Sequence, residues 1–235
     1  MRHEEKFLCS SRQLYLIESR IKNFLKLDEN QQGDRYVIRS IYFDTNTDRF
    51  YEESLQGLSE RDKYRIRIYN LSDSVIKLEK KTTINQLKKK STSFLRRDEV
   101  DNILKNNNRN DLYTANDNVV NGFLKLQTTE MLLPKVVVEY ERKAYVNNIG
   151  NVRITMDSNL RASWEVDHFF ESNLVEIPVL SEDKGILEVK YNEILPGYLV
   201  RILNLGFLQQ ISFSKYVLCR NVIINNGRRE EGYEF

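Results

Sequence analysis

Alternating basic residues mark part of this 235-residue sequence as a strand with one cationic face. In segment 63–69, Lys63, Arg65 and Arg67 alternate with tyrosine and isoleucine residues. Because successive side chains of a strand point to opposite faces, the three cations would share one face of a sheet. Arginine offers a planar fork to phosphate oxygens and lysine a compact point charge, so the segment is suited to binding a phosphorylated anion.

Three further segments repeat this pattern, each with a polar face opposite an apolar one. The residues on their polar faces are Lys77, Glu79 and Lys81, then Arg153, Thr155 and Asp157, and finally Glu188 and Lys190. One such segment is by itself an ordinary amphipathic strand with its charges in water. The set favours a different arrangement, in which helices cover the apolar faces and the charged faces point inward. Because crowded like charges repel one another, such an interior is suited to a polyanion.

Composition excludes several other classes of protein. Apolar residues make up 40% of the sequence and charged residues 30%, which allows a core and argues against intrinsic disorder. Lys and Arg total 36 against 34 Asp and Glu, a less basic balance than nucleic-acid binding usually shows. No run approaches the ~18 apolar residues of a membrane span, and the charged N-terminus is unlike a secretory signal. Two cysteines are too few for a disulfide framework or a zinc site. Together, these features lead us to expect a soluble cytoplasmic protein that binds no nucleic acid.

Periodicity predicts an α+β fold. Helices are expected at residues 11–26, 98–105, 117–132, 196–205 and 214–224. Strands are expected at 6–9, 36–43, 63–69, 75–81, 92–95, 135–146, 151–157 and 185–191. Strands with so few helices between them favour an antiparallel sheet or barrel over a parallel array. Scarce glycine and proline indicate one domain over 1–220, with a surface loop at 105–118 and a helix end and frayed tail at 221–235.

Eight short motifs follow one another along the chain and together resemble the VTC domain. They are Arg2–Lys6, Ser40–Thr45, Lys63–Tyr69, Leu78–Lys81, Tyr140–Tyr145, Val152–Asp157, Leu187–Lys190 and Ser212–Tyr216. The VTC domain is the polyphosphate polymerase domain of the triphosphate tunnel metalloenzyme, or CYTH-like, superfamily. The resemblance implies a closed, antiparallel, eight-stranded β-tunnel with helices, including those at 11–26 and 214–224, packed outside.

The resemblance also implies an activity, namely metal-dependent transfer of the ATP γ-phosphate onto a growing polyphosphate chain. The phosphate-binding residues that it implies are Lys6, Arg65, Arg67, Lys81, Lys90, Arg142, Arg153, Lys190 and Lys215. The catalytic residues that it implies are Arg65, Arg67, Lys81 and Glu188. Glu188 would be the ligand of a divalent metal, Mn²⁺ or Mg²⁺, with Glu4 as a weaker candidate. ATP and polyphosphate are the implied partners, and a membrane-protein partner is left open.

Two positions depart from the family pattern or fit it loosely. Related triphosphatases and cyclases open with Glu-x-Glu-x-Lys, but here Arg2 replaces the first glutamate, which favours the polymerase branch. Lys90 is the third of three consecutive lysines, so its assignment could shift by one position.

Arg142 raises a question of geometry. By alternation it shares a face with Val138 and Tyr140, so it reaches a polar interior only if the strand bulges. Without a bulge, Glu139 and Glu141 would point inward instead.

The chemistry suits these residue types, because phosphoryl transfer requires positioning and charge neutralisation more than covalent catalysis. A hard divalent cation prefers oxygen ligands such as Glu188, with Glu79 as another candidate beside Glu4. Two alternatives stay open: hydrolysis of inorganic or nucleoside triphosphates, and a non-catalytic polyanion-binding module. Glu188 argues against the last, because binding a polyanion does not by itself require a carboxylate.

Overall fold

The computed structural model of the chain describes residues 2–29, 31, 33–85, 87–105, 117–212 and 214–230. The chain divides into two compact units. Unit 1 consists of Met1–Val37, Tyr140–Leu160 and Leu180–Phe213, and unit 2 of Ile38–Glu139, Arg161–Val179 and Ser214–Phe235. Most of the loop predicted at 105–118 and the end of the predicted tail lie outside the described residues. A single domain over 1–220 stays a prediction.

The strands of the described residues form one eleven-stranded sheet in the order β11-β1-β10-β8-β7-β3-β4-β5-β6, with β2 beside β7 and β9 beside β8. The strands are β1 (Arg2–Ser10), β2 (Lys26–Leu27), β3 (Tyr36–Asp44), β4 (Glu60–Tyr69), β5 (Ser72–Ile84), β6 (Leu87–Leu95), β7 (Leu133–Asn147), β8 (Val152–Ser163), β9 (Ile177–Pro178), β10 (Lys184–Asn192) and β11 (Gln209–Gln210). The α+β class and the antiparallel pairing of the predicted strands are confirmed.

The strand order corrects the prediction of a closed eight-stranded tunnel. Over the described residues, the order ends at β11 and at β6, so the sheet is open. The strands β2, β9 and β11 have two residues each, too few for an alternating pattern to be visible in the sequence. Closure depends on pairing between the first and last strands, which alternation within single strands does not report.

Five of the helices lie where the sequence predicts them, and α2 was not predicted. The helices are α1 (Ser11–Ile21), α2 (Arg49–Leu55), α3 (Arg97–Leu104), α4 (Asn118–Thr129), α5 (Gly197–Leu203) and α6 (Lys215–Glu230). Short 3-10 turns occupy Ile149–Asn151, Val166–His168 and Leu205–Phe207. The start of α2 is held by Asp44, whose carboxylate accepts hydrogen bonds from the N–H groups of Phe50 and Tyr51, at 2.8 Å each. Because this carboxylate belongs to the preceding strand, no local capping pattern shows it.

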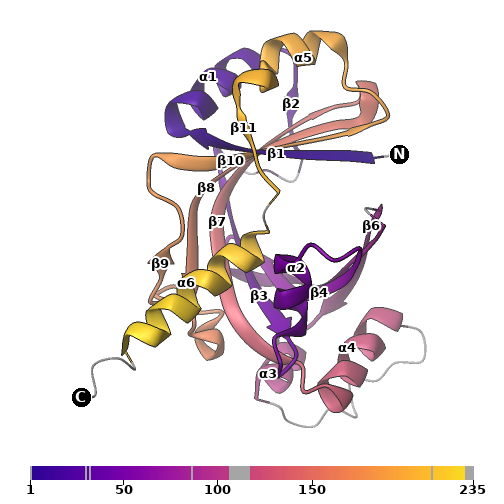
Figure 1. Cartoon of the computed structure of the whole chain (residues 1–235), viewed down its shortest axis with the longest axis vertical. Helices are drawn as coiled ribbons and strands as arrows, with labels where there is room; N and C mark the ends of the chain where they lie inside the picture. The colour runs from indigo at the N-terminus through magenta and orange to yellow at the C-terminus, as the bar shows by residue number, and fades with distance from the viewer. Residues whose placement is uncertain are drawn as a thin grey trace. The chain divides into compact units, whose positions relative to one another are not determined.

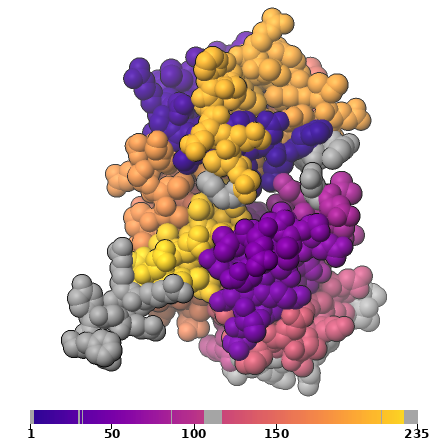
Figure 2. All heavy atoms as spheres, in the orientation of Figure 1, coloured from indigo at the N-terminus to yellow at the C-terminus, as the bar shows by residue number. Residues whose placement is uncertain are grey.

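In unit 1, α1 and α5 cover one face of β1, β10 and β8 (Figure 1). Figure 2 shows the atoms of α1 (indigo) and α5 (orange) on the surface of this unit. The helix α1 begins with a capping box, in which Ser10 and Gln13 exchange side-chain and backbone hydrogen bonds. Gly185 permits the close approach of α1 to β10, because a Cβ there would lie 2.6 Å from a methyl group of Leu14.

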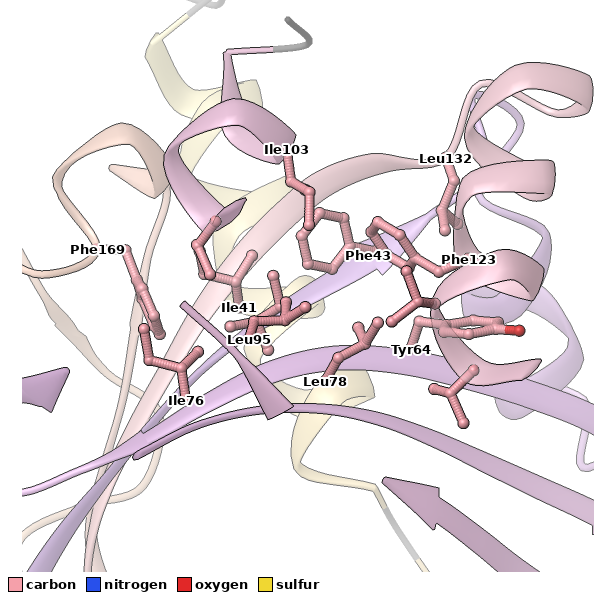
Figure 3. Close-up of a cluster of buried hydrophobic side chains, with 14 of the residues drawn as sticks. Ile41, Phe43, Tyr64, Ile76, Leu78, Leu95, Ile103, Phe123, Leu132 and Phe169 are labelled. Atoms are coloured by element: carbon pink, nitrogen blue, oxygen red, sulfur yellow. The ribbon is translucent and has the colours of Figure 1, made fainter. Parts of the chain in front are cut away.

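In unit 2, α3 and α4 pack on one face of the strands β3, β4 and β5. Figure 3 shows Ile103 of α3 and Phe123 of α4 among the buried side chains of these strands. Tyr64, Ile66 and Ile68 of β4 are fully buried in this layer. The predicted covering of the apolar faces by helices is therefore confirmed, and the basic side chains of β4 lie on the opposite face.

The C-terminal helix α6 contacts the charged face, contrary to the prediction that it packs outside. Its residue Tyr216 stacks on Tyr42 of β3, with ring centroids 5.1 Å apart, and Tyr42 lies directly opposite Arg65. Lys63 of β4 donates to the hydroxyl of Ser214 at 3.0 Å, just before α6 begins. The Tyr216 hydroxyl also donates to the buried carboxylate of Asp44 at 2.5 Å, which anchors the helix there.

Candidate functional site

One face of the paired segments of β4, β5 and β6 in unit 2 gathers the basic residues of the alternating pattern. The cations on this face are Arg61, Lys63, Arg65, Arg67, Lys77, Lys81, Lys88 and Lys90. Among the described residues of these segments, Glu79 is the only carboxylate on the same face. We call this surface the cationic face.

Glu79 holds the centre of the cationic face. Its carboxylate lies 2.6 Å from Arg65 and 2.9 Å from Lys90, and Arg67 is 3.5 Å away. Only 2% of Glu79 is exposed. Burial alone would raise the pKa of Glu79, but the three cations outweigh it and hold the pKa well below its usual range. Glu79 is therefore ionised, and it orients the basic groups, which together with it we call the Glu79 cluster.

Neutral side chains of β3 complete the positioning of the two arginines. Arg65 donates to the hydroxyl of Tyr42 at 2.7 Å, and Arg67 donates to the hydroxyl of Ser40 at 3.3 Å. Register places Ser40 opposite Arg67 and Tyr42 opposite Arg65, so all four lie on the same face. Both residues belong to a segment that resembles a family motif, but the sequence alone predicted no role for either, because β3 carries no alternating charges to mark its polar face.

Lys63, Lys81 and Lys90 form a row of direct neighbours across three strands. Like charges directly opposite one another destabilise a sheet. Lys90 contacts Glu79, and Lys63 contacts the hydroxyl of Ser214. The predicted residue Lys215 is next to Ser214 at the start of α6. The row places three cations side by side on the cationic face.

Unit 1 holds a second charged cluster, made of Glu4 and Lys6 on β1 and of Glu188 and Lys190 on β10. Lys190 Nζ lies 2.7 Å from a Glu188 oxygen and 3.7 Å from a Glu4 oxygen. Lys6 Nζ lies 3.8 Å from Glu188 and 3.4 Å from Glu4. Each lysine bridges the same two carboxylates, and these four side chains are called the Glu188 cluster below.

The Glu188 cluster fits a divalent cation that is shared with a phosphate ligand. Magnesium usually keeps several waters and takes one or two protein carboxylates plus substrate phosphates. Glu4 and Glu188 supply two carboxylates, and Thr155, directly opposite Glu188, has a buried Oγ1 without a hydrogen-bond partner in the described structure. The described residues contain no group of three or more His, Cys, Asp or Glu side chains that could hold a metal. A metal here would therefore take its remaining oxygen ligands from water or from a bound phosphate.

The predicted phosphate-binding residues Arg142 and Arg153 each contact a carboxylate in unit 1. Arg142 Nε and Nη2 donate to Asp157 at 2.6 and 2.7 Å, and only 8% of the residue is exposed. Arg153 Nε and Nη2 lie 3.0 and 2.9 Å from Asp28. Sequence reasoning missed Asp28, because it lies in an irregular segment without a pattern. Binding of phosphate by either arginine stays a prediction.

The two glutamates beside Arg142 in the sequence have other partners. Glu139 accepts a 2.5 Å hydrogen bond from Arg39, which is 1% exposed. Glu141 accepts from the amide of Asn159 at 2.8 Å. Of the three neighbouring charged residues, it is therefore Arg142, through Asp157, that contacts the charged side of β8.

Eight of the eleven predicted residues thus fall into two groups, and Arg142, Arg153 and Lys215 lie outside both. The structure brings Arg65, Arg67, Lys81 and Lys90 together on one face of unit 2. It brings the four members of the Glu188 cluster together in unit 1. That both groups act on one ligand stays a prediction.

Comparisons with known proteins give a family match and several similar solved structures. The family model described as VTC domain matches residues 1–224. Among solved structures, a candidate adenylate cyclase of Bacillus halodurans is similar, with TM-score 0.54 and 14% identity, covering 90% of this chain and 92% of that chain. The PH1819 protein of Pyrococcus horikoshii has TM-score 0.46 and 13% identity, covering 92% and 97%. The comparison with curated proteins found no match.

Proposed function

The chain belongs to the VTC domain family, and on this premise we propose that it is a metal-dependent polyphosphate polymerase. It would transfer the γ-phosphate of ATP onto the end of a polyphosphate chain. Family membership supports an enzyme that acts on triphosphates, and the charged clusters support the finer proposal.

The cationic face is the observation that carries the proposal. Its row of Lys63, Lys81 and Lys90 sets three cations directly opposite one another across three strands, and like charges in this position repel. A single phosphate would reach only part of this row. A triphosphate or polyphosphate carries several negative charges along a chain and would neutralise it along its length.

The residues of the Glu79 cluster match what phosphoryl transfer needs from a protein, which is positioning and charge neutralisation. Arg65 and Arg67, oriented by Glu79, would hold phosphate oxygens with their remaining N–H groups. Lys81 would add a point charge beside them. The attacking terminal phosphate oxygen is already ionised at neutral pH, so no general base is required.

Glu188 and Glu4 would hold a Mn²⁺ or Mg²⁺ ion, which would neutralise charge on the phosphate oxygens when bound. Lys6 and Lys190 balance these carboxylates in the structure described above. The same lysines would remain close enough to contact phosphate oxygens.

A product assay tests the proposal. Purified protein incubated with ATP and Mn²⁺ should produce long chains on a polyphosphate gel. Free phosphate without chains would instead show a triphosphatase, in which water replaces the chain end as acceptor. Tight binding of polyphosphate without any turnover would show a polyanion-binding module.

Arg65→Ala should weaken ATP binding about tenfold or more, because a hydrogen bond to a charged group is worth roughly 1.5–3 kcal/mol. Arg153→Ala makes the same test of a predicted phosphate-binding residue in unit 1. The matched control is Lys80→Ala, which removes a cation of β5 that is bound to Asp62 on the opposite face. Calorimetric titration measures the ATP affinity of all three variants. Parental affinity in both arginine variants would show that neither Arg65 nor Arg153 binds the nucleotide.

Within the described part of the chain, no helix combines the length and apolar character needed to cross a membrane. A cytoplasmic location and a membrane-protein partner stay predictions.

A further inference from the structure

An exposed aromatic ring lies on the cationic face of unit 2. Phe94 of the edge strand β6 is 71% exposed. Register places it opposite Lys77 of β5, which in turn lies opposite Arg67 of β4. Paired residues share a face, so the ring lies on the same side of the sheet as Lys90. Its neighbour Leu95 points to the other side and is buried in the core of the unit.

Lys77 links this ring to the charged groups. Its Nζ atom lies 5.0 Å from the centre of the Tyr69 ring and 5.9 Å from the centre of the Phe94 ring. Both distances fall within the range of attraction between a cation and an aromatic face. The Phe94 ring is therefore held beside a cation, while most of its surface is open to solvent. An aromatic surface next to a cation is suited to a ligand with a flat ring and a nearby phosphate.

We propose that Phe94 is a stacking platform for the base of the nucleotide, and that Lys77 contacts the part of the phosphate chain nearest to the ribose. This inference rests on the proposed function and adds to it a subsite for the base. Exposed aromatic side chains bind bases by stacking, whatever the identity of the base, because every base has a π-face.

The spacing along β6 agrees with this assignment. A strand advances about 3.4 Å per residue, so Phe94 and Lys90 are about 14 Å apart along the strand. That span is comparable to a base, a ribose and an extended phosphate chain together. A nucleotide with its base on Phe94 would therefore present its outer phosphates to Lys90 and Lys81. Inorganic triphosphate would use the same cations without contacting Phe94.

The test compares two ligands on the full chain, ATP and inorganic triphosphate, each titrated calorimetrically in the presence of Mg²⁺. Phe94→Ala should raise the Kd for ATP about tenfold, the loss of one stacked base, and leave the Kd for triphosphate unchanged. Phe94→Trp should keep the parental affinity for ATP. Leu87→Ala is the matched control, because Leu87 is a 62% exposed side chain of the same strand on the opposite face.

Two results would overturn the assignment of Phe94 while leaving the proposed function intact. One is unchanged ATP affinity in Phe94→Ala. The other is an equal loss of affinity for both ligands, which would indicate a structural role for the ring. If the parent protein binds neither ligand, the proposed function fails, and the base subsite fails with it.

Discussion

Glu188→Gln should remove most metal-dependent consumption of ATP while leaving the chain folded and able to bind nucleotide. Glutamine has the shape of glutamate but lacks the negative charge that a divalent cation requires. A bound metal contributes several kcal/mol to phosphoryl transfer, and each 1.36 kcal/mol is a factor of ten in rate, so the loss should be roughly a hundredfold or more. The fold should persist because Lys6 and Lys190 both keep Glu4 as a partner, at 3.4 and 3.7 Å.

Three measurements distinguish a metal-binding role of Glu188 from a purely structural one. Thermal unfolding and ATP affinity should remain close to those of the parent, because the cations are intact. Binding of Mn²⁺ in the presence of inorganic triphosphate, followed by electron paramagnetic resonance, should weaken together with turnover.

Glu5→Gln is the matched control for this experiment, because Glu5 lies on β1 facing away from the Glu188 cluster and accepts a hydrogen bond from Tyr191. It should retain both metal binding and turnover. Parental turnover in Glu188→Gln would make Glu188 a counter-ion of the two lysines and move the metal to another carboxylate.

The sequence was sufficient to predict which face of a strand is charged. Lys63, Arg65 and Arg67 share a face because side chains alternate along any strand, wherever the strand lies in the fold. The helices that cover the opposite face could be predicted for the same reason, since their apolar stripes repeat locally. Whether the sheet closes into a barrel could not be predicted in this way, because closure depends on pairing between residues far apart in the sequence.

The partners of individual charged groups were also beyond local reasoning. Arg142 is bound by Asp157 and Arg153 by Asp28, contacts that no spacing within one strand encodes. Glu79 could be placed on the correct face from alternation. That it is buried among three cations, and therefore orients them, follows only from the register of β4, β5 and β6.

Glu79→Gln should lower the stability of the ligand-free chain by about 3–5 kcal/mol at neutral pH, the cost of removing one partner from a buried ion pair. The substitution leaves Arg65, Arg67 and Lys90 facing one another without a buried carboxylate between them. Asp62→Asn is the matched control. It breaks an ion pair with Lys80 on the opposite face, in which both side chains are partly exposed to solvent, and should cost at most about 1 kcal/mol.

The difference in stability between the parent and Glu79→Gln should depend on pH in a defined direction. Because the folded state lowers the pKa of Glu79, its stabilising effect is fully present above the pKa of an unfolded glutamate, about 4.3. The effect is lost as the pH falls below that value toward the lower pKa of the folded state. Urea unfolding should therefore show a large difference between parent and Glu79→Gln at pH 7 and a smaller one at pH 3. A difference that stays constant between these pH values would contradict the assigned ionisation.

Inorganic triphosphate should restore more stability to Glu79→Gln than it adds to the parent. In the parent, Glu79 already neutralises part of the charge of these cations, so they attract a phosphate ligand less strongly than they would without it. Removing the carboxylate should therefore tighten the binding of triphosphate and increase the upward shift of Tm at a fixed ligand concentration. Equal shifts in the two proteins would mean that the ligand binds elsewhere than at the Glu79 cluster. A larger shift in the variant would tie phosphate binding to Arg65, Arg67 and Lys90, independently of any assay of turnover.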